Sequence, residues 1–221
     1  MNNLSNKKFL DPNLKNKSKT VEEKIQLYKF NDNLLPLPTE IEISESGTCN
    51  RSCSFCPRSD PNFEDKKEFI TDTLHEKLCT ELKELKYKGT IRYSGFVEPM
   101  LDKNIYNLVN YAKKTNPSAR VEIISNGDVL NEKRLKKIYD SGLDRLQISL
   151  YDGEDQFKKF QQLGKSLNLS EEQYVLRKRY LPEEQDFGIT LSNRGGMLTK
   201  STYKIAPKAE PVNSTCNYPS Y

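Results

Sequence analysis

Short apolar strands alternate with amphipathic helices along most of this 221-residue chain. The alternation of apolar and polar residues predicts strands at residues 39–44, 90–93, 120–125, 144–150 and 187–191. Helical periodicity predicts helices at residues 73–86, 105–112, 130–139, 154–163 and 171–179. Strands that alternate with helices favour βα units and a parallel sheet, and right-handed crossovers would place the helices on one face of a curled sheet.

The predicted fold class is α/β, a partial parallel (β/α) barrel of about five to six units that is related to the TIM barrel. Five units can be recognised, which is too few for an eight-unit barrel. We place the barrel at residues 39–197, after a mobile N-terminal arm at residues 1–38. The first 20 residues of that arm are rich in Asn, Lys and Ser and have little to bury. Residues 198–221 are expected to form an irregular tail.

Three of the five cysteines lie in one run directly after the first predicted strand: Cys49, Cys53 and Cys56. Cysteine thiolates are the usual ligands of iron–sulfur clusters. Three thiolates leave one iron of a four-iron cluster open to another ligand, whereas a fully ligated metal is usually structural. Disulfides fit poorly, because the number of cysteines is odd and the three are closely spaced. A zinc site with a distant fourth ligand is the alternative, although a second pair of ligands is missing.

The spacing C-x3-C-x2-C, with the aromatic Phe55 before the third cysteine, resembles the signature of the radical S-adenosylmethionine (SAM) superfamily. The resemblance implies that Cys49, Cys53 and Cys56 ligate a [4Fe-4S] cluster. It implies that SAM binds the open iron beside Phe55 and is cleaved reductively to a 5′-deoxyadenosyl radical. That radical would abstract a hydrogen atom from the substrate, so the cofactors would supply the chemistry and the protein would orient them.

Polar or glycine-containing stretches follow every predicted strand, and parallel α/β folds bind ligands at that edge of the sheet. The resemblance implies that Ser94, Gly95 and Glu98, in the run Ser-Gly-Phe-Val-Glu-Pro, contact the amino and carboxylate groups of SAM. The family often has Gly-Gly-Glu-Pro here, and this chain has Val97 in place of the second glycine. A plain turn is the alternative interpretation of this run.

Three further residues are assigned to SAM through the same resemblance. Asn126 stands in a Ser-Asn-Gly run that resembles the Thr-Asn-Gly of the family, although Asn-Gly by itself is only a turn signal. Ser149, on the fourth predicted strand, is expected to hydrogen-bond the ribose, with a solvent-facing serine as the alternative. Arg177 is expected to contact SAM from a helix that carries several basic residues. Cys216 resembles the first cysteine of a SPASM- or twitch-type auxiliary-cluster extension, and the chain is expected to stop before that domain, with an incidental cysteine in the tail as the alternative.

The charge of the chain is nearly balanced, with 35 Lys and Arg, 31 Asp and Glu, and a net charge of +4. No basic stripe with interleaved aromatic residues occurs, so nucleic acid is not an expected partner. No apolar run approaches the roughly 20 residues of a membrane span, and residues 1–10 do not resemble a secretory leader. We therefore expect a cytoplasmic protein without a membrane partner.

A single histidine, His75, occurs in the whole chain, which disfavours Ser-His-Asp triads and multi-histidine metal sites. His75 is expected to lie on the surface of its predicted helix, whose buried face would carry Leu74, Leu78 and Leu82. Cys79 stands beside that face and is expected to be a packed thiol.

The sequence leaves the substrate open. The resemblance to superfamily members with an auxiliary-cluster extension favours a peptide or protein, and a small molecule is the alternative. It also implies a reducing electron donor, such as flavodoxin or ferredoxin, as a partner. Two other classes of function stay open, namely a non-catalytic zinc-binding module and a truncated, inactive relative.

Overall fold

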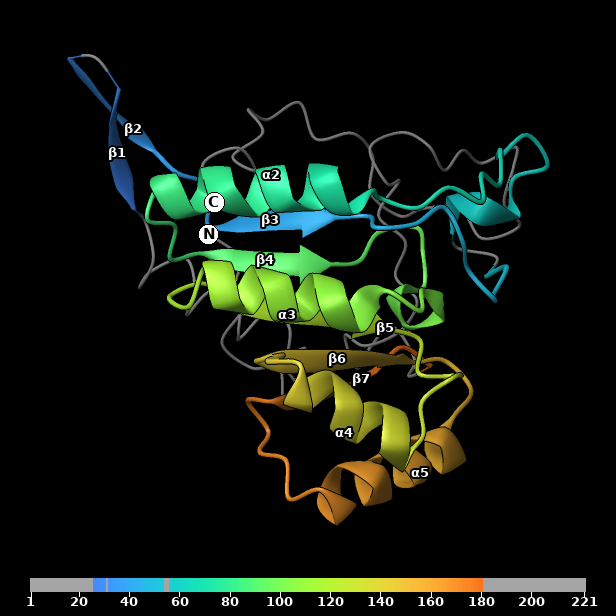
Figure 1. The fold of residues 1–221 in the computed structure, drawn as a ribbon. Coiled ribbons are helices and arrows are strands. Elements are labelled where there is room, and N and C mark those ends of the chain that lie inside the picture. Colours follow the sequence, from blue (N-terminus) through green and yellow to red (C-terminus); the bar gives the residue numbers. More distant parts are fainter. Residues whose placement is uncertain (1–25, 31, 54–55, 181–221) are drawn as a thin grey trace, which may run out of the picture.

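A five-stranded parallel sheet forms the centre of the computed structural model, which describes residues 26–30, 32–53 and 56–180 (Figure 1). Each strand pairs in parallel with the next strand along the chain. The strands are β3 (Glu40–Ile43), β4 (Thr90–Tyr93), β5 (Arg120–Ser125), β6 (Arg145–Leu150) and β7 (Tyr174–Lys178). This order of strands confirms the predicted α/β fold of consecutive βα units.

Four α-helices connect these strands and lie on one side of the sheet (Figure 1). Two of the helices begin at side-chain caps, where Thr71 and Asn131 each accept a hydrogen bond from a backbone N–H of the first turn. The helices are α2 (Asp72–Glu84), α3 (Ile105–Thr115), α4 (Glu132–Asp140) and α5 (Glu154–Ser166), and two short 3-10 helices are η1 (Pro57–Ser59) and η2 (Pro99–Leu101). None of the helices within the described ranges is both long and apolar enough to cross a membrane.

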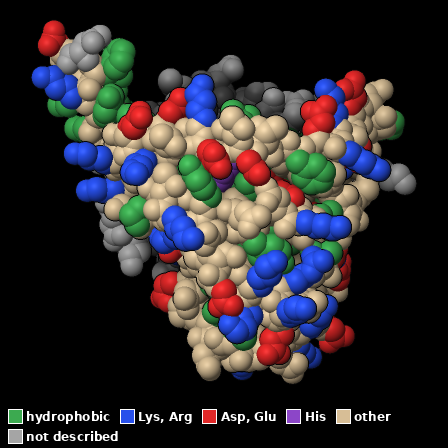
Figure 2. All heavy atoms as spheres, viewed as in Figure 1, with side chains coloured by type: hydrophobic (Ala, Val, Ile, Leu, Met, Phe, Trp, Pro, Cys, Tyr) green, Lys and Arg blue, Asp and Glu red, His purple; other side chains and the backbone are tan. Residues whose placement is uncertain are grey.

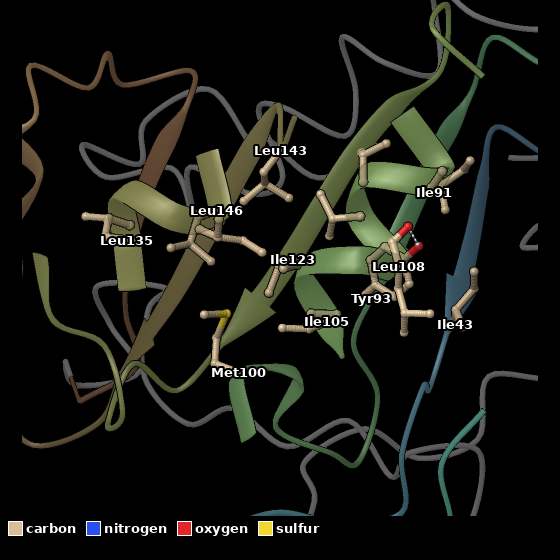
Figure 3. Close-up of a cluster of buried hydrophobic side chains, with 14 of the residues drawn as sticks. Ile43, Ile91, Tyr93, Met100, Ile105, Leu108, Ile123, Leu135, Leu143 and Leu146 are labelled. Carbon is tan, nitrogen blue, oxygen red and sulfur yellow. Dashed lines mark hydrogen bonds between the residues drawn. The ribbon is translucent and has the colours of Figure 1, made fainter. Parts of the chain in front are cut away.

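The hydrophobic core lies between the sheet and these helices (Figure 3). Ile91, Ile123 and Leu146 come from three neighbouring strands and have no exposed surface. Leu108 of α3 and Leu135 of α4 belong to the same buried cluster. Each such side chain stabilises the fold by about 1.5–3 kcal/mol when it is fully buried, so this layer holds the βα units together.

The opposite face of the sheet carries buried charged side chains. Arg92 of β4, Glu122 of β5 and Arg145 of β6 are each less than 10% exposed. Glu122 accepts a hydrogen bond from Arg92 Nη2 at 2.8 Å and from Arg145 Nη1 at 3.0 Å. Because successive residues of a strand face opposite sides, one face is apolar and the other is polar. A polar inner face is what a curled, partly closed sheet requires if it is to enclose a polar ligand.

The prediction that His75 lies on the surface of its helix is wrong. His75 is 1% exposed, whereas Leu74, predicted to face the core, is 55% exposed. The His75 ring forms a 2.6 Å hydrogen bond, through Nε2, with the hydroxyl of Tyr93, and α2 buries His75 and Cys79 together with Leu82 of the predicted face. Burial also lowers the pKa of His75. Cys79 is fully buried on the same face, which confirms the packed thiol.

The helix predicted at residues 171–179 is also wrong, since this segment contains β7. The edge of β6 offers unpaired backbone groups, and residues 174–178 complete the ladder there, with Ser149 opposite Arg177. Pairing with a neighbouring strand overrides local helix propensity in such cases. The strand predicted at residues 187–191 lies outside the described residues, so β7 is the fifth strand of the sheet.

A two-stranded antiparallel hairpin, which the sequence pattern does not predict, precedes the sheet. It consists of β1 (Leu27–Phe30) and β2 (Asn33–Pro36) and lies within the segment expected to be a mobile arm. It projects from the sheet-and-helix body (Figure 1). Its exposed apolar side chains include Phe30 and Leu34. Across the face shown in Figure 2, Lys and Arg are interspersed with Asp and Glu.

Candidate active site

One pocket lies at the carboxyl ends of the parallel strands, the side to which the strand arrows point in Figure 1. It encloses about 680 Å³ of empty space, a volume that includes the open solvent at its mouth. Loops that are distant in sequence meet there because parallel strands end at the same edge of a sheet. Eight of the ten predicted site residues line the pocket: Cys49, Cys53, Cys56, Ser94, Gly95, Glu98, Asn126 and Ser149.

The three cysteines lie on the loop that leads from β3 to η1. The backbone N–H of Cys56 donates to the carbonyl oxygen of Cys53 at 2.8 Å, and Pro57 begins η1. None of the three cysteines forms a disulfide, and each is partly exposed. Within the described part of the chain, no three His, Cys, Asp or Glu side chains converge on a single ion. A four-iron cluster is held by separate thiolates, so three thiols spread around one pocket fit its donor set.

The protonation of the thiols depends on their burial. Burial raises the pKa of both Cys49 and Cys53, and the guanidinium of Arg51 opposes this shift at Cys53. Only the deprotonated thiolate ligates a metal. Cluster binding by this loop is therefore coupled to the release of protons.

Gly95 follows β4 in a backbone conformation that favours glycine, with φ at +122°. A Cβ atom at this position would lie 2.2 Å from the Oγ of Ser44, which itself donates to the carbonyl oxygen of Ser94 at 2.9 Å. The ends of β3 and β4 thus approach so closely that the chain has no room for a side chain there. The result is an exposed stretch of backbone in the wall of the pocket.

Glu98 is buried and connects three loops. Its carboxylate accepts hydrogen bonds from the Ser125 hydroxyl at 2.7 Å, the Asn126 N–H at 2.6 Å and the Met100 N–H at 3.1 Å. Its own N–H donates to the carbonyl oxygen of Thr48, beside the first cysteine, at 2.8 Å. Burial raises the pKa of Glu98, and these hydrogen bonds oppose the shift. Both carboxylate oxygens are occupied within the protein, so Glu98 acts mainly by holding the end of β5 against the cysteine loop.

Asn126 and Ser149 follow or end the two neighbouring strands. The Asn126 amide donates to the Oδ1 of Asn50 at 2.8 Å, which joins the end of β5 to the loop between the first two cysteines. Ser149 is 6% exposed, and it lies on the polar face of β6. Both side chains are therefore directed to the pocket side of the sheet rather than to the apolar core.

Two predicted site residues are not found in the pocket wall. Phe55 lies outside the described residues. Arg177 is on β7, opposite Ser149 in the ladder, and is not among the residues that line the pocket. The sheet places it next to the site, but on a strand rather than on the predicted helix.

Sequence reasoning missed the arginines of the cysteine loop, Arg51 and Arg58, which also line the pocket. Arg58 donates through Nη1 to the carbonyl oxygens of Gly47 at 3.0 Å and Phe96 at 3.1 Å, and it pairs with Asp65. It therefore ties the start of the loop to the end of β4. In the sequence, Arg51 and Arg58 are marked as possible site residues only by their positions within and just after the cysteine run. Most of their hydrogen-bond partners lie far away along the chain, so the pattern of nearby residues does not indicate their role.

A carboxyl group, that of Glu45, is fully buried behind the cysteine loop. Burial raises its pKa to about 8, and nearby Asp102 and Glu98 add to the shift. Oε1 accepts a hydrogen bond from the Ser46 hydroxyl at 3.2 Å, while Oε2 is buried and has no hydrogen-bond partner among the described residues. The folded protein therefore binds a proton here between about pH 4.5 and 8 that the unfolded chain releases.

We expect Glu45→Gln to weaken the dependence of stability on pH. In this window the native state binds the extra proton, so the free energy of unfolding of the natural protein falls as the pH rises. The shift corresponds to at most about 5 kcal/mol, at about 1.4 kcal/mol per pH unit. Glutamine does not titrate, so we expect the variant to gain up to about 4 kcal/mol relative to the natural protein between pH 5 and pH 8, while its buried amide donor adds a cost that does not depend on pH. Urea unfolding of cluster-free protein at both pH values measures this, and parallel curves for the two proteins would contradict it.

Comparisons with known proteins agree with this site. The sequence profile of the Radical SAM superfamily matches residues 43–174. An S-adenosyl-L-methionine-dependent 2-deoxy-scyllo-inosamine dehydrogenase from Niallia circulans is 31% identical over 180 residues, which cover 81% of this chain and 66% of that protein. A GTP 3′,8-cyclase from Chlorobaculum tepidum is 30% identical over 136 residues, which cover 58% of this chain and 39% of the cyclase.

A solved structure supports the same relationship. The crystal structure of BtrN in complex with AdoMet and 2-DOIA resembles this chain with a TM-score of 0.62 and 29% identity. The match covers 74% of this chain and 63% of BtrN. The partial parallel barrel is therefore confirmed by a protein whose structure contains the SAM cofactor.

A partial barrel with three thiols in a loop at the carboxyl ends of its strands is typical of iron–sulfur proteins that bind a cofactor beside the cluster. This chain belongs to the radical SAM superfamily. Enzymes of that superfamily use a [4Fe-4S] cluster and SAM, which confirms the predicted cofactors. The chain spans only 66% of the dehydrogenase and 39% of the cyclase. The predicted auxiliary-cluster extension concerns Cys216, which lies outside the described residues, and it stays a prediction.

Proposed function

We propose that this chain cleaves SAM reductively at a [4Fe-4S] cluster held by Cys49, Cys53 and Cys56, and that a small hydroxylated molecule then donates a hydrogen atom. One observation carries this proposal. The three thiols line the same pocket as the exposed backbone at Gly95 and the polar side chains of Asn126 and Ser149. The thiols of a cluster ligand set and polar groups that can bind a cofactor are thus adjacent, as the chemistry of the superfamily requires.

The residues of the chain bind and orient the cofactors. The three thiolates would hold the cluster, which supplies, when bound, the electron for cleavage of a carbon–sulfur bond of SAM. The backbone at Ser94 and Gly95 can approach the amino and carboxylate groups of SAM, and the Ser149 hydroxyl can bond the ribose. Glu98 would hold the Asn126 backbone in place through its 2.6 Å hydrogen bond.

The proposed substrate is a small polyhydroxylated molecule. Two relatives are named for small polar substrates, an aminocyclitol and GTP. The polar side chains that line the pocket, among them Asn126 and Ser149, suit hydroxyl and amino groups better than the apolar side chains of a peptide. The cluster and SAM, when bound, would supply a carbon-centred radical able to take a hydrogen atom from a hydroxyl-bearing carbon of the substrate, and the electron would come from a donor such as flavodoxin or ferredoxin.

The proposal is tested by reconstituting the chain with iron and sulfide without oxygen. Reduction with dithionite in the presence of SAM is expected to yield methionine and 5′-deoxyadenosine, measured by mass spectrometry. A 2-deoxy-scyllo-inosamine deuterated at its hydroxyl-bearing carbons then probes the substrate class. Transfer of deuterium into 5′-deoxyadenosine supports a cyclitol of this kind, and its absence contradicts that substrate.

Two results would support the alternatives. Colourless protein that retains zinc after reconstitution would indicate the zinc-binding module. Protein that assembles a cluster but forms no 5′-deoxyadenosine would indicate an inactive piece of a longer enzyme. Both results contradict the proposed function of the chain.

A further inference from the structure

Arg51 lies between the first two cysteines and binds a carboxylate from the end of β5. Its Nε donates to Asp128 Oδ2 at 2.7 Å and its Nη2 donates to Asp128 Oδ1 at 2.5 Å. This two-point geometry is the strong form of an arginine–carboxylate pair, because both hydrogen bonds are charge-assisted and parallel. The loop of the cysteines is thereby fixed to a residue 77 positions further along the chain.

The same guanidinium binds a second carboxylate at the end of β6. Its Nη1 donates to Asp152 Oδ1 at 2.9 Å and its Nη2 donates to Asp152 Oδ2 at 2.6 Å. The Cζ atom of Arg51 also lies 5.5 Å from the centre of the Tyr151 ring, in the range of a cation–π contact. The Arg51 side chain is only 19% exposed, although Asp152 is 54% exposed. One arginine thus joins three loops around the pocket.

Both carboxylates are held in place independently of Arg51. Asp128 accepts from the Asn50 amide at 2.8 Å, and its N–H donates to the Asn126 Oδ1 at 2.9 Å. Asp152 accepts from the Gln156 amide at 3.0 Å. These contacts leave each carboxylate little freedom to turn away, so the guanidinium meets acceptors that are already oriented.

We infer that Arg51 is a positioning residue that fixes the distance between the cysteine ligands and the SAM-binding ends of β5 and β6. The inference rests on the proposed function for what the pocket holds, while the ion-pair cluster itself (Arg51, Asp128 and Asp152) stands on the geometry alone. Asn126 and Ser149 lie close to the two aspartates in sequence, and Cys49 and Cys53 lie two residues on either side of Arg51. A shift of one loop would therefore change the fit of SAM against the cluster.

Lysine cannot replace arginine in this role. The ammonium of lysine is a single point charge, whereas the planar guanidinium presents donors to two carboxylates at once. Arg51→Lys would thus keep the positive charge but lose the hydrogen bonds to two carboxylates at once, which makes it the informative variant. Arg51→Met removes the charge and the hydrogen bonds.

The first test uses the cluster-free protein and measures hydrogen exchange by mass spectrometry. In Arg51→Met we expect amide exchange at residues 47–53, 126–129 and 150–153 to be about threefold to tenfold faster, as for the loss of a partly exposed bidentate pair. Asp128→Asn should speed amide exchange in the first two segments. In the double variant, Arg51→Met with Asp128→Asn, the increases in exchange rate should be smaller than the sum of those in the two single variants. The matched control is Lys136→Met, which removes an ion pair with Asp140 on the outer helix α4 and should leave these segments unchanged.

The second test uses protein reconstituted with iron and sulfide. We expect Arg51→Lys to raise the KM for SAM about tenfold and to lower kcat less, since misplaced binding groups weaken ground-state binding. Unchanged exchange in Arg51→Met, or additive effects in the double variant, would overturn the ion-pair cluster. An equal fall in kcat and kcat/KM would overturn the positioning role. If the natural chain cleaves no SAM, the proposed function fails, but the exchange result still decides whether Arg51 joins the loops.

Discussion

Replacing Cys53 with alanine is expected to abolish cluster binding and SAM cleavage while the fold remains. Cys53 lines the pocket between two other thiols, and its side chain is partly exposed, so alanine leaves no cavity in the core. Residues that only support metal ligands already cost about 10- to 100-fold when they are changed, so loss of a ligand should lower 5′-deoxyadenosine formation by more than about 100-fold. Iron content and visible absorbance measure cluster binding, 5′-deoxyadenosine formation measures SAM cleavage, and thermal unfolding of the cluster-free form measures whether the fold remains.

Cys79→Ala is the matched control for this experiment. Cys79 is fully buried in α2, and burial raises the pKa of its thiol to about 11, so it stays protonated and inert. Alanine there should lower stability by about 1 kcal/mol, the usual cost of a small cavity, without loss of iron. If Cys53→Ala retained a full cluster, or if Cys79→Ala lost it, the assignment of ligands would be wrong.

Replacing Glu98 with alanine is expected to destabilise the protein by about 3 kcal/mol, because several buried donors lose their acceptor and each costs about 1–3 kcal/mol. These donors are the Ser125 hydroxyl and the N–H groups of Met100 and Asn126. Glu98→Gln keeps one carbonyl oxygen and should cost about half as much. Urea unfolding of the cluster-free protein measures both values.

The control for Glu98 is Glu76→Ala, which removes an exposed carboxylate from α2. A change of this kind normally alters stability by less than about 0.5 kcal/mol. A loss for Glu98→Ala that is no larger than for Glu76→Ala would show that Glu98 does not hold the end of β5. A large loss in stability with an unchanged KM for SAM would separate this structural role from cofactor binding.

Most of the fold could be predicted from the sequence because apolar periodicity records which face of each element is buried. It succeeded for β3 to β6 and for helices α2 to α5. It failed at β7, where pairing with the edge of β6 outweighs local helix propensity. It also failed at His75, because a single hydrogen bond to Tyr93 allows a polar ring to occupy the core.

The candidate site was predictable where a residue stands at a strand end and was not predictable where a role depends on distant partners. The cysteines, Gly95 and Asn126 follow strands, so topology alone brings them together. Arg51 could not be assigned, because its carboxylate partners lie 77 and 101 residues away. Glu98 was recognised as part of the site, but its expected contact with SAM did not include the internal hydrogen bonds that occupy both of its oxygens.

The order of the strands in the sheet has a consequence for biosynthesis. Each strand pairs with the one that leaves the ribosome directly before or after it, so the sheet can grow in the direction of translation. The thiol-bearing loop emerges with the first of these strands, whereas Asp128 and Asp152 emerge much later. A nascent chain therefore carries three unsupported thiols until the 101 residues that follow Arg51, up to and including Asp152, have been synthesised. The pocket around the three thiols is therefore complete only after these later loops have been synthesised.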